Sequence, residues 1–511
     1  MAISIRNSSV SNVQERSLGV SIGLMAAALL LAGLVVLLSS DLTESFPYLY
    51  LIPWLIGLMA VLLLPTLILH YQGKLTLVDP LVYATWSYFF PAFVVGGFML
   101  TAGWSQPYFL SFIQDPATNL PYTVVIIGLG FGGLAIGYLS PVGRRLGTSL
   151  GQFLPQKDFD SSALFIPGLI LLILGTFNTF GALIIGVVGY QRADAIDSYS
   201  GLVFLTTLFW MQGSFILWFV IFRRGIVDVK AVSVFGVLLL LTIGRALISG
   251  NRAALFQVFL IVTLAFILAG GRFNFKRTVA AGFVLTVCLV AGMIYGTTFR
   301  HVKGTEARVS FEQYTDNIFE TIDQVGKFDL VGGLEVALLG FAERLDTFSS
   351  VAVVVSNYEQ LAPYEESYGL DNNIWKDLST FFIPRVIWDE KPIASEPRKY
   401  SDLYFDFGEN SFAITPMADL LRNFGPIGVP IGMFLFGIII RSIYRTLIED
   451  QPRTFWRVTL FFMLIMAISY EGFYGILIPY LFKVGFTALV GILIVGLVAR
   501  ALGHRRTLTP N

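Results

Sequence analysis

The sequence predicts an all-α integral membrane protein with about twelve transmembrane helices and one large extracytoplasmic loop between the ninth and tenth. Hydrophobic residues make up 55% of the 511 positions and charged residues only 13%, a composition outside the range of soluble domains. Apolar runs of about 20 residues, the length needed to cross a ~30 Å hydrocarbon core, recur along the chain. Lysine and arginine alternate between the connections of these runs, as the positive-inside rule requires.

The apolar runs are expected to be helices. A strand in lipid would leave backbone groups unpaired unless a barrel closed around it, and these runs lack the alternation of barrel strands. The first run is too long for the apolar part of a signal peptide and no small-residue cleavage site follows it, so it is expected to remain as a helix. The predicted spans are 17–39, 48–69, 80–102, 121–140, 163–187, 201–222, 231–249, 253–270, 278–297, 425–440, 456–470 and 476–499.

The alternation of positive charge predicts the orientation. Nineteen lysines and arginines lie in the termini and in every second connection, whereas the opposite short connections carry only Arg192 and Arg252. Cytoplasmic segments retain positive charge during insertion, so both termini are expected to be cytoplasmic. The same alternation places the loop outside.

The chain is thus expected to have three parts: residues 1–297 with helices 1–9, the loop 298–424, and residues 425–511 with helices 10–12 and a cytoplasmic C-terminus. The loop holds 21 of the 34 acidic residues and eleven of the 34 basic ones, so it is net acidic while the cytoplasmic face is basic. Within the loop, residues 331–355 have the pattern of an amphipathic helix, which is expected at the membrane surface.

Several function classes lack support in the sequence. The single cysteine, Cys288, lies in an apolar run, and the three histidines have no metal-binding spacing, so neither a disulfide framework nor a metal site is expected. No P-loop, dinucleotide-binding glycine motif or G-x-S-x-G elbow occurs, which disfavours nucleotide-driven transport and serine hydrolysis. The acidic loop disfavours nucleic acid as a partner. No cofactor is therefore expected.

Two charges inside predicted spans, Arg245 and Lys483, are candidates for a functional site, because a charge in the bilayer costs several kcal/mol. Counting residues places them about 6 and 10 Å below the outer ends of their helices. A buried partner such as Glu471 would be the structural alternative. If these cations bind a ligand, it should be anionic and reach them from the outer leaflet, as a lipid-linked diphosphate would.

Further basic residues gather at the same level. Arg252 follows an outer turn, and Arg300 and His301 end the ninth helix on that side. For Arg252 and Arg300, snorkelling toward lipid headgroups is the alternative to a binding role.

The later part of the loop mixes aromatic side chains with carboxylates and amides. Aromatic rings pack against the apolar faces of sugars while carboxylates accept hydroxyl hydrogen bonds, so the mixture suits a glycan. The same residues could instead fold the loop onto the helices. The aromatic residues are Tyr358, Tyr364, Tyr368, Trp375, Trp388, Tyr400, Tyr404, Phe405 and Phe407.

Three stretches carry a resemblance to a known family. They are Ser249-Gly250-Asn251-Arg252-Ala253; Tyr368-Gly369 followed by Phe382-Ile383-Pro384-Arg385-Val386-Ile387-Trp388 and Lys391-Pro392; and Arg422-Asn423-Phe424-Gly425-Pro426-Ile427-Gly428-Val429. In these short motifs and in the topology of most of its length, the chain resembles the Wzy-type polymerases of bacterial O-antigen, capsule and exopolysaccharide repeat units.

The resemblance implies a fold like that of the GT-C-like polymerases and ligases, in the bacterial cytoplasmic (inner) membrane. It implies a glycosyltransferase that moves a growing glycan from one undecaprenyl diphosphate carrier to a hydroxyl of another lipid-linked repeat unit, on the outer face and without a metal. The implied partners are the undecaprenyl-diphosphate-linked oligosaccharide and membrane lipid. A chain-length regulator and a flippase are candidate protein partners.

Such a transfer needs cations around the departing diphosphate and a base near the acceptor hydroxyl. The candidate bases are Glu343, Asp346 and His301. For Arg344, an ordinary surface ion pair is the alternative to a binding role. The candidate cations are Arg252, Arg344 and Arg385, followed by Arg245, Arg300, Arg398, Arg422 and Lys483.

Three other functions remain open. An O-antigen ligase would use the same donor with a lipid A core acceptor, and the residues do not separate the two. A lipid-linked oligosaccharide flippase or other transporter should show two repeated halves and charges around a mid-membrane cavity, whereas no repeat is visible here. A non-enzymatic scaffold or sensor that binds polysaccharide would leave glycan length unchanged when the loop arginines are replaced.

Overall fold

Eight helices in the described part of the computed structural model are long and apolar enough to cross a membrane. They are Leu49–Tyr71, Pro80–Thr101, Pro116–Leu139, Ser161–Ile184, Gly201–Arg224, Phe275–Lys303, Pro416–Leu447 and Tyr474–Ala501. The structure describes residues 47–103, 107–185, 187, 200–224, 229–304, 310–329, 332–333, 336–337, 340, 345–383, 387–388, 390–392, 395–407, 412, 414–505 and 507–508.

Each of these eight helices coincides with a predicted span. The predicted span 17–39 lies outside the described residues. The other three predicted spans fall on helices with shorter apolar stretches, so the structure supports eight spans by length and composition where the sequence suggested about twelve. These three are α12 (Val229–Ser249), α13 (Ala254–Leu268) and α21 (Phe455–Ala467).

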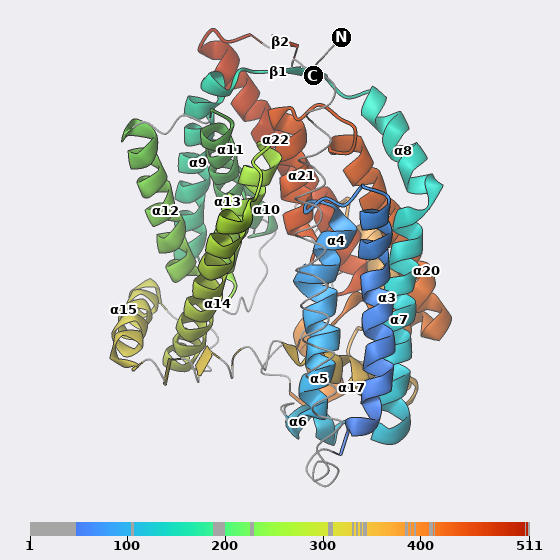
Figure 1. The fold of residues 1–511 in the computed structure, drawn as a ribbon. Coiled ribbons are helices and arrows are strands. Elements are labelled where there is room, and N and C mark those ends of the chain that lie inside the picture. The colour runs from blue at the N-terminus through green and yellow to red at the C-terminus, as the bar shows by residue number, and fades with distance from the viewer. Residues whose placement is uncertain are drawn as a thin grey trace.

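The helices form two groups that lie side by side (Figure 1). The first group, drawn mainly in blue and cyan, packs with α20 (Pro416–Leu447). Its elements are η1 (Leu49–Leu51), α3 (Ile52–Tyr71), α4 (Pro80–Ala84), η2 (Thr85–Val95), α5 (Gly96–Thr101), α6 (Pro107–Ser111), α7 (Pro116–Leu139) and α8 (Pro141–Gln152).

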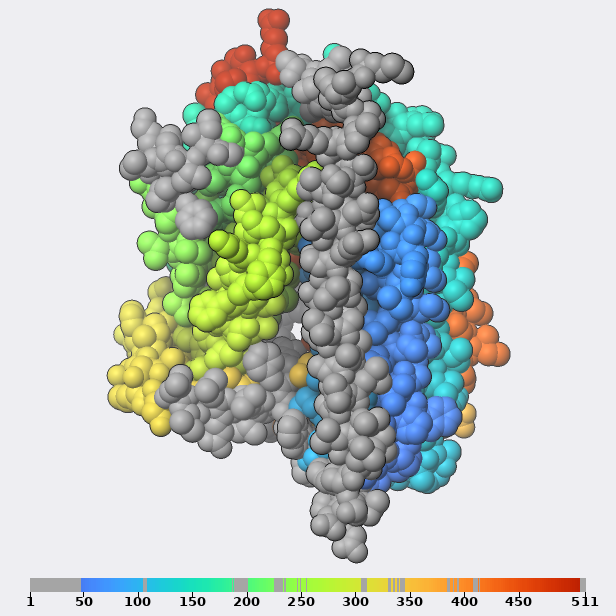
Figure 2. Space-filling view, in the orientation of Figure 1, coloured from blue at the N-terminus to red at the C-terminus, as the bar shows by residue number. Residues whose placement is uncertain are grey.

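The second group, drawn mainly in green, contains α12, α13 and the elements around them. One of its members, α14 (Phe275–Lys303), shows one face of the helix in the space-filling view, and α15 (Phe311–Lys327) protrudes beside its end (Figure 2). The remaining elements of this group are η3 (Ser161–Leu164), α9 (Phe165–Ile184), α10 (Ser200–Thr207) and α11 (Phe209–Arg224).

The C-terminal helices join the two groups. Helix α21 and helix α22 (Tyr474–Ala501) pack on each other, on α11 of the second group and on α20. A two-residue strand β1 (Lys157–Asp158) pairs with β2 (Thr507–Leu508) at what we call the C-terminal end of the bundle. Helices α5, α6, α15 and α17 (Thr347–Leu361) mark the opposite end, which we call the loop end (Figure 1). Besides α15, the described part of the loop contains α17, η4 (Ala362–Tyr364), α18 (Asn373–Thr380) and α19 (Pro397–Phe405).

Helices α7 and α20 lie unusually close because glycines line their contact. A Cβ atom on Gly133 would lie 2.3 Å from the Pro430 carbonyl oxygen, and one on Gly137 would lie 2.1 Å from that of Phe434. Small residues let helix backbones approach in lipid, where packing rather than the hydrophobic effect drives association. The contact continues along α8, where Gly143 and Gly147 face the last turns of α20.

A second set of contacts fixes the C-terminal end of the bundle. The buried Arg457 side chain donates to the carbonyl oxygens of Thr446 at 2.7 Å and Gly151 at 3.4 Å, in the last turns of α20 and α8. A cation suits this place because helix C-termini carry partial negative charge. Arg441 pairs with Glu449 at 2.7 Å nearby.

The described end of the predicted amphipathic helix is buried and does not lie at the surface. The end of the 331–355 stretch belongs to α17, whose residues Thr347–Val355 are all buried against α5, α7 and α20. The turn at Asp346 starts this helix, and its run of valines is apolar on every side, as expected of a buried helix. In the described part of the loop, α15 is a surface helix, with four carboxylates and the exposed side chains of Phe311, Phe319 and Ile322.

Candidate functional site

A buried group of charged and polar side chains lies where the loop meets α20 and α22. Two of its members are on the first turns of α20, before Gly425, whose positive φ of 69° breaks the helix. The others come from the loop between α17 and α19. We call this group the loop-end cluster; it consists of Glu365, Asn373, Asp377, Ser395, Asp419 and Arg422.

Arg422 is the centre of the cluster. Its fully buried guanidinium lies 2.9 Å from Glu365 Oε1 and 2.9 Å from Asp419 Oδ1. It also donates to Asn373 Oδ1 at 2.6 Å and to the Leu370 carbonyl at 3.2 Å. A buried cation requires such partners because desolvation is costly. Arg422 therefore links the loop to α20.

Asp419 connects the same site to α22. Its Oδ2 accepts hydrogen bonds from the backbone N–H groups of Tyr474 at 2.8 Å and Gly475 at 3.4 Å, at the start of that helix. A carboxylate is stabilised there by the partial positive charge of the helix N-terminus. One side chain thus holds the beginnings of two spans together.

A chain of hydrogen bonds leads from Arg422 toward α18. Asn373 donates to Ser395 Oγ at 2.7 Å, and Ser395 donates to Asp377 Oδ2 at 2.7 Å. Burial raises the pKa of Asp377, an effect that the bonds from Ser395 and the nearby positive charge of Lys483 oppose. The end of this chain is therefore a carboxyl group that holds its proton more firmly than usual.

Glu365 lies at the other side of Arg422. Tyr404 donates to its Oε1 at 2.9 Å. Burial raises the pKa of Glu365, although Arg422 acts in the opposite direction, and burial likewise raises the pKa of Tyr404. The cluster contains more carboxyl groups than cations, so a shared proton would lower its electrostatic cost.

Lys483 was expected inside the span, and it is on α22 with an exposed side chain. Its positive charge interacts with the carboxyl group of Asp377, which is a different acidic partner from Glu471, the structural alternative named above. Lys483 is thus at the edge of the loop-end cluster.

Arg252 lies in a tight turn between α12 and α13, in the second helix group. Gly250 adopts a φ of 60°, and a Cβ atom there would lie 2.5 Å from the Phe299 ring. The turn packs on α14 at Gly296, whose Cβ would lie 2.7 Å from the Arg252 Cα atom. Because Arg252 is only 8% exposed, it is buried in protein instead of extending to headgroups.

Arg245 is held by an aromatic ring. Its guanidinium carbon lies 3.9 Å from the centre of the Trp210 ring, on α11. Near the same place, Tyr295 and Tyr314 donate to the carbonyl oxygens of Leu247 and Ile248, which closes the last turn of α12. Arg245 and Arg252 thus belong to one region of the second group.

The remaining predicted site residues are dispersed. His301 is exposed and Arg300 half-buried at the end of α14, and Arg398 is half-buried on α19. Asp346 is buried before α17. Glu343, Arg344 and Arg385 lie outside the described residues.

Most of the predicted sugar-binding aromatics have a packing role. Tyr400, Tyr404 and Phe405 are buried in the hydrophobic core. Tyr364 and Trp375 are exposed by 60% and 61%, so these two are accessible to a ligand.

One of the three stretches that suggested a family contributes to the loop-end cluster, where it bonds to residues that follow Tyr368-Gly369 of another. Asn423 donates to Asn373 Oδ1 at 2.8 Å, and Arg422 bonds to Leu370, which directly follows Tyr368-Gly369. The stretch around Arg252 packs instead on α14. Sequence reasoning missed Glu365, Asp377 and Asp419, for which the acidic composition of the loop was the available signal.

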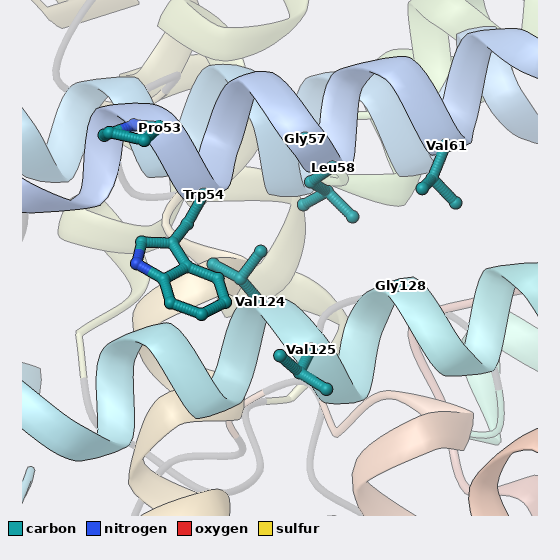
Figure 3. A pocket seen from close by; sticks show the side chains of 8 residues that line it. All are labelled: Pro53, Trp54, Gly57, Leu58, Val61, Val124, Val125 and Gly128. Carbon is teal, nitrogen blue, oxygen red and sulfur yellow. The ribbon is translucent and has the colours of Figure 1, made fainter.

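The cavity between α3 and α7 has a different character. It holds about 360 Å³, is lined by apolar side chains and glycines, and contains none of the predicted site residues (Figure 3). Among the described residues, no group of three or more histidine, cysteine or acidic side chains is placed to hold a metal ion.

The spans and the buried charges at their loop end define a multi-pass α-helical membrane protein with a folded loop domain. The chain belongs to the family described as "Domain of unknown function (DUF8712)", which matches residues 178–450, just over half of its length. No curated protein and no solved structure matches it.

Proposed function

We propose that this protein is a glycosyltransferase that polymerises undecaprenyl-diphosphate-linked oligosaccharide repeat units, with the loop end on the outer face of the bacterial cytoplasmic membrane. In this proposal the chain has about twelve spans and both termini are cytoplasmic, as the charge alternation favours. The supporting observation is that Arg422-Asn423 and the segment after Tyr368-Gly369, about 50 residues apart, bond to each other in a buried site.

The proposed reaction joins an acceptor sugar oxygen to the anomeric carbon of the donor glycan. The bond from that carbon to the diphosphate oxygen breaks, and the diphosphate leaves with the electron pair. The acceptor hydroxyl gives its proton to a base. Among the described base candidates, His301 is exposed and suits this step better than Asp346, which is buried.

Cations stabilise a departing diphosphate most where they are fixed before the reaction. Arg252 and Arg245 meet this condition, because one is held by its turn on α14 and the other by Trp210. Arg422 has a different task, since its guanidinium is already paired with two carboxylates. It positions the loop.

The test replaces Arg252 with Ala and with Lys in a strain that lacks the chromosomal copy. We expect Arg252→Ala to abolish long glycan chains at unchanged membrane protein level, and Arg252→Lys to restore them partly, because lysine lacks the bidentate fork. The exposed Arg145→Ala is the matched control and should give normal ladders. Normal ladders from Arg252→Ala would refute the diphosphate-binding role, and the same pair of substitutions at Arg385 tests the second motif.

A further inference from the structure

An exposed aromatic surface lies on the loop beside two spans. Trp375 is 61% exposed and Phe382 60% exposed, although both belong to a loop that an aqueous compartment would surround. Their neighbours are also aromatic: the Trp375 ring lies 6.0 Å from Phe424, and Phe381 lies 5.3 Å from Phe482. We call these five residues the α18 edge. Exposed apolar patches of this kind mark interaction surfaces.

Helix α18 runs along the first part of α22. Its beginning is close to Gly475, where a Cβ atom would lie 2.9 Å from the Ile374 Cα atom, and its end brings Phe381 to Phe482. The loop therefore follows α22 for seven residues, or about 10 Å, in the direction of the membrane.

The length of α22 indicates how close the end of α18 comes to the hydrocarbon core of the membrane. The helix has 28 residues, whereas about 20 cross the hydrocarbon core. Counted back from Arg500 in its last turn, the core ends near Phe482. The C-terminal end of α18, next to Phe482, is then level with the boundary between acyl chains and headgroups.

The α18 edge is continuous with the lipid-facing sides of two spans. On α20, Ile427 and Ile431 are exposed one and two turns beyond Phe424, and on α22, Phe486 and Leu489 are exposed beyond Phe482. On spanning helices such exposed apolar stripes face lipid. The edge therefore extends a lipid-facing surface onto the loop.

We infer that the α18 edge is inserted into the leaflet at the loop end and that its partner is the phospholipid bilayer. Tryptophan favours this interfacial layer, and phenylalanine is common on apolar faces that are inserted at the boundary between headgroups and acyl chains. Lys483, exposed next to Phe482, extends its ammonium toward the lipid phosphates. The buried side of α18 carries Asn373 and Asp377, so one short helix separates the loop-end cluster from lipid.

The inference is independent of the proposed function and is tested by spin labelling. Nitroxide labels are placed by Trp375→Cys and Phe382→Cys in separate proteins that carry Cys288→Ser, since Cys288 is the single native cysteine. In liposomes of phosphatidylglycerol and phosphatidylethanolamine, we expect both labels to be relaxed several-fold more by oxygen than by a water-soluble nickel chelate.

Two control labels calibrate this ratio. Leu493→Cys, on the exposed face of α22, should favour oxygen, and Tyr364→Cys, 60% exposed on η4, should favour the chelate. Chelate-dominated relaxation at both Trp375 and Phe382, like that at Tyr364, would overturn the inference. Spin–spin broadening between two copies labelled at Phe382 would also overturn it, because it would identify the edge as a contact between protein molecules.

Discussion

The guanidinium of Arg245 lies over the ring of Trp210, with 3.9 Å between its central carbon and the centre of the ring. A cation in a largely apolar site is stabilised by an aromatic face, by about 2 kcal/mol when water is excluded. The pair joins α11 and α12, and it orients a positive charge without neutralising it.

A double-mutant cycle should measure this coupling. We expect Arg245→Met and Trp210→Leu each to destabilise the protein, and the double variant to be less destabilised than the sum by about 1–2 kcal/mol. Unfolding in mixed micelles with increasing SDS provides the free energies. Additive effects would show that the ring contributes only apolar packing.

Replacing Arg422 should release the loop from the spans. Arg422→Met leaves Glu365 and Asp419 as buried carboxylates without their cation, and breaking a buried pair costs about 3–5 kcal/mol. We expect faster proteolytic cleavage in the loop and a lower thermal midpoint. The exposed Lys399→Ala on α19 is the control and should behave as wild type. Wild-type cleavage of Arg422→Met would contradict the role of the cluster as a support of the loop.

Asp377 should make stability depend on pH. Its pKa is raised in the folded protein, so the stability that its neutral carboxyl contributes is complete below the ordinary value of 3.8 and is lost as pH rises through the folded pKa. Asp377→Asn imitates the neutral form and can still accept from Ser395. We expect the variant to have the higher thermal midpoint at about pH 8 and the difference to shrink toward about pH 4. A constant difference at both pH values would exclude this titration.

Two adjacent glycines of α7 test the close helix contact. Gly133→Ala would force a Cβ atom to within 2.3 Å of the Pro430 carbonyl oxygen, whereas a Cβ on Gly132 meets nothing within 4 Å. We expect Gly133→Ala to lower the thermal midpoint by several degrees, and Gly132→Ala to leave it unchanged or raise it, because alanine favours a helix by about 1 kcal/mol. Equal midpoints would mean that α7 and α20 are not packed this tightly.

Labelling of single cysteines should establish the orientation. In the Cys288→Ser protein, a membrane-impermeant maleimide added to intact cells should modify Tyr364→Cys, and it should reach Phe153→Cys only after permeabilisation. Both side chains are exposed, and they lie at opposite ends of the bundle. A difference in labelling would therefore report the side of the membrane and not the burial of either residue. The reverse pattern would place the loop in the cytoplasm and overturn the proposed function.

The spans could be predicted because an apolar run is a local property: α9 and α22, for example, are visible in the sequence alone. The loop-end cluster could not, since Glu365 and Arg422 are far apart in sequence and only the folded loop brings them to 2.9 Å. The sequence predicts a surface helix over 331–355 because the apolar run 351–355 follows the charged residues Glu343, Arg344 and Asp346, and periodicity alone does not show that this run is buried. The Gly425-Pro426 dipeptide was a usable signal for the break in α20.

The glycine-lined contact between α7 and α20 limits how the two sides of the membrane can communicate. The backbones are in close contact from Gly133 on α7 to Gly147 on α8. A shift of α20 along its axis would therefore cause collisions at each of these glycines. Within α20 we therefore expect a displacement of Arg422 to be absorbed at the break at Gly425, which leaves Asp419 and its hydrogen bond to the start of α22 as the route by which the loop could act on the opposite end of the bundle.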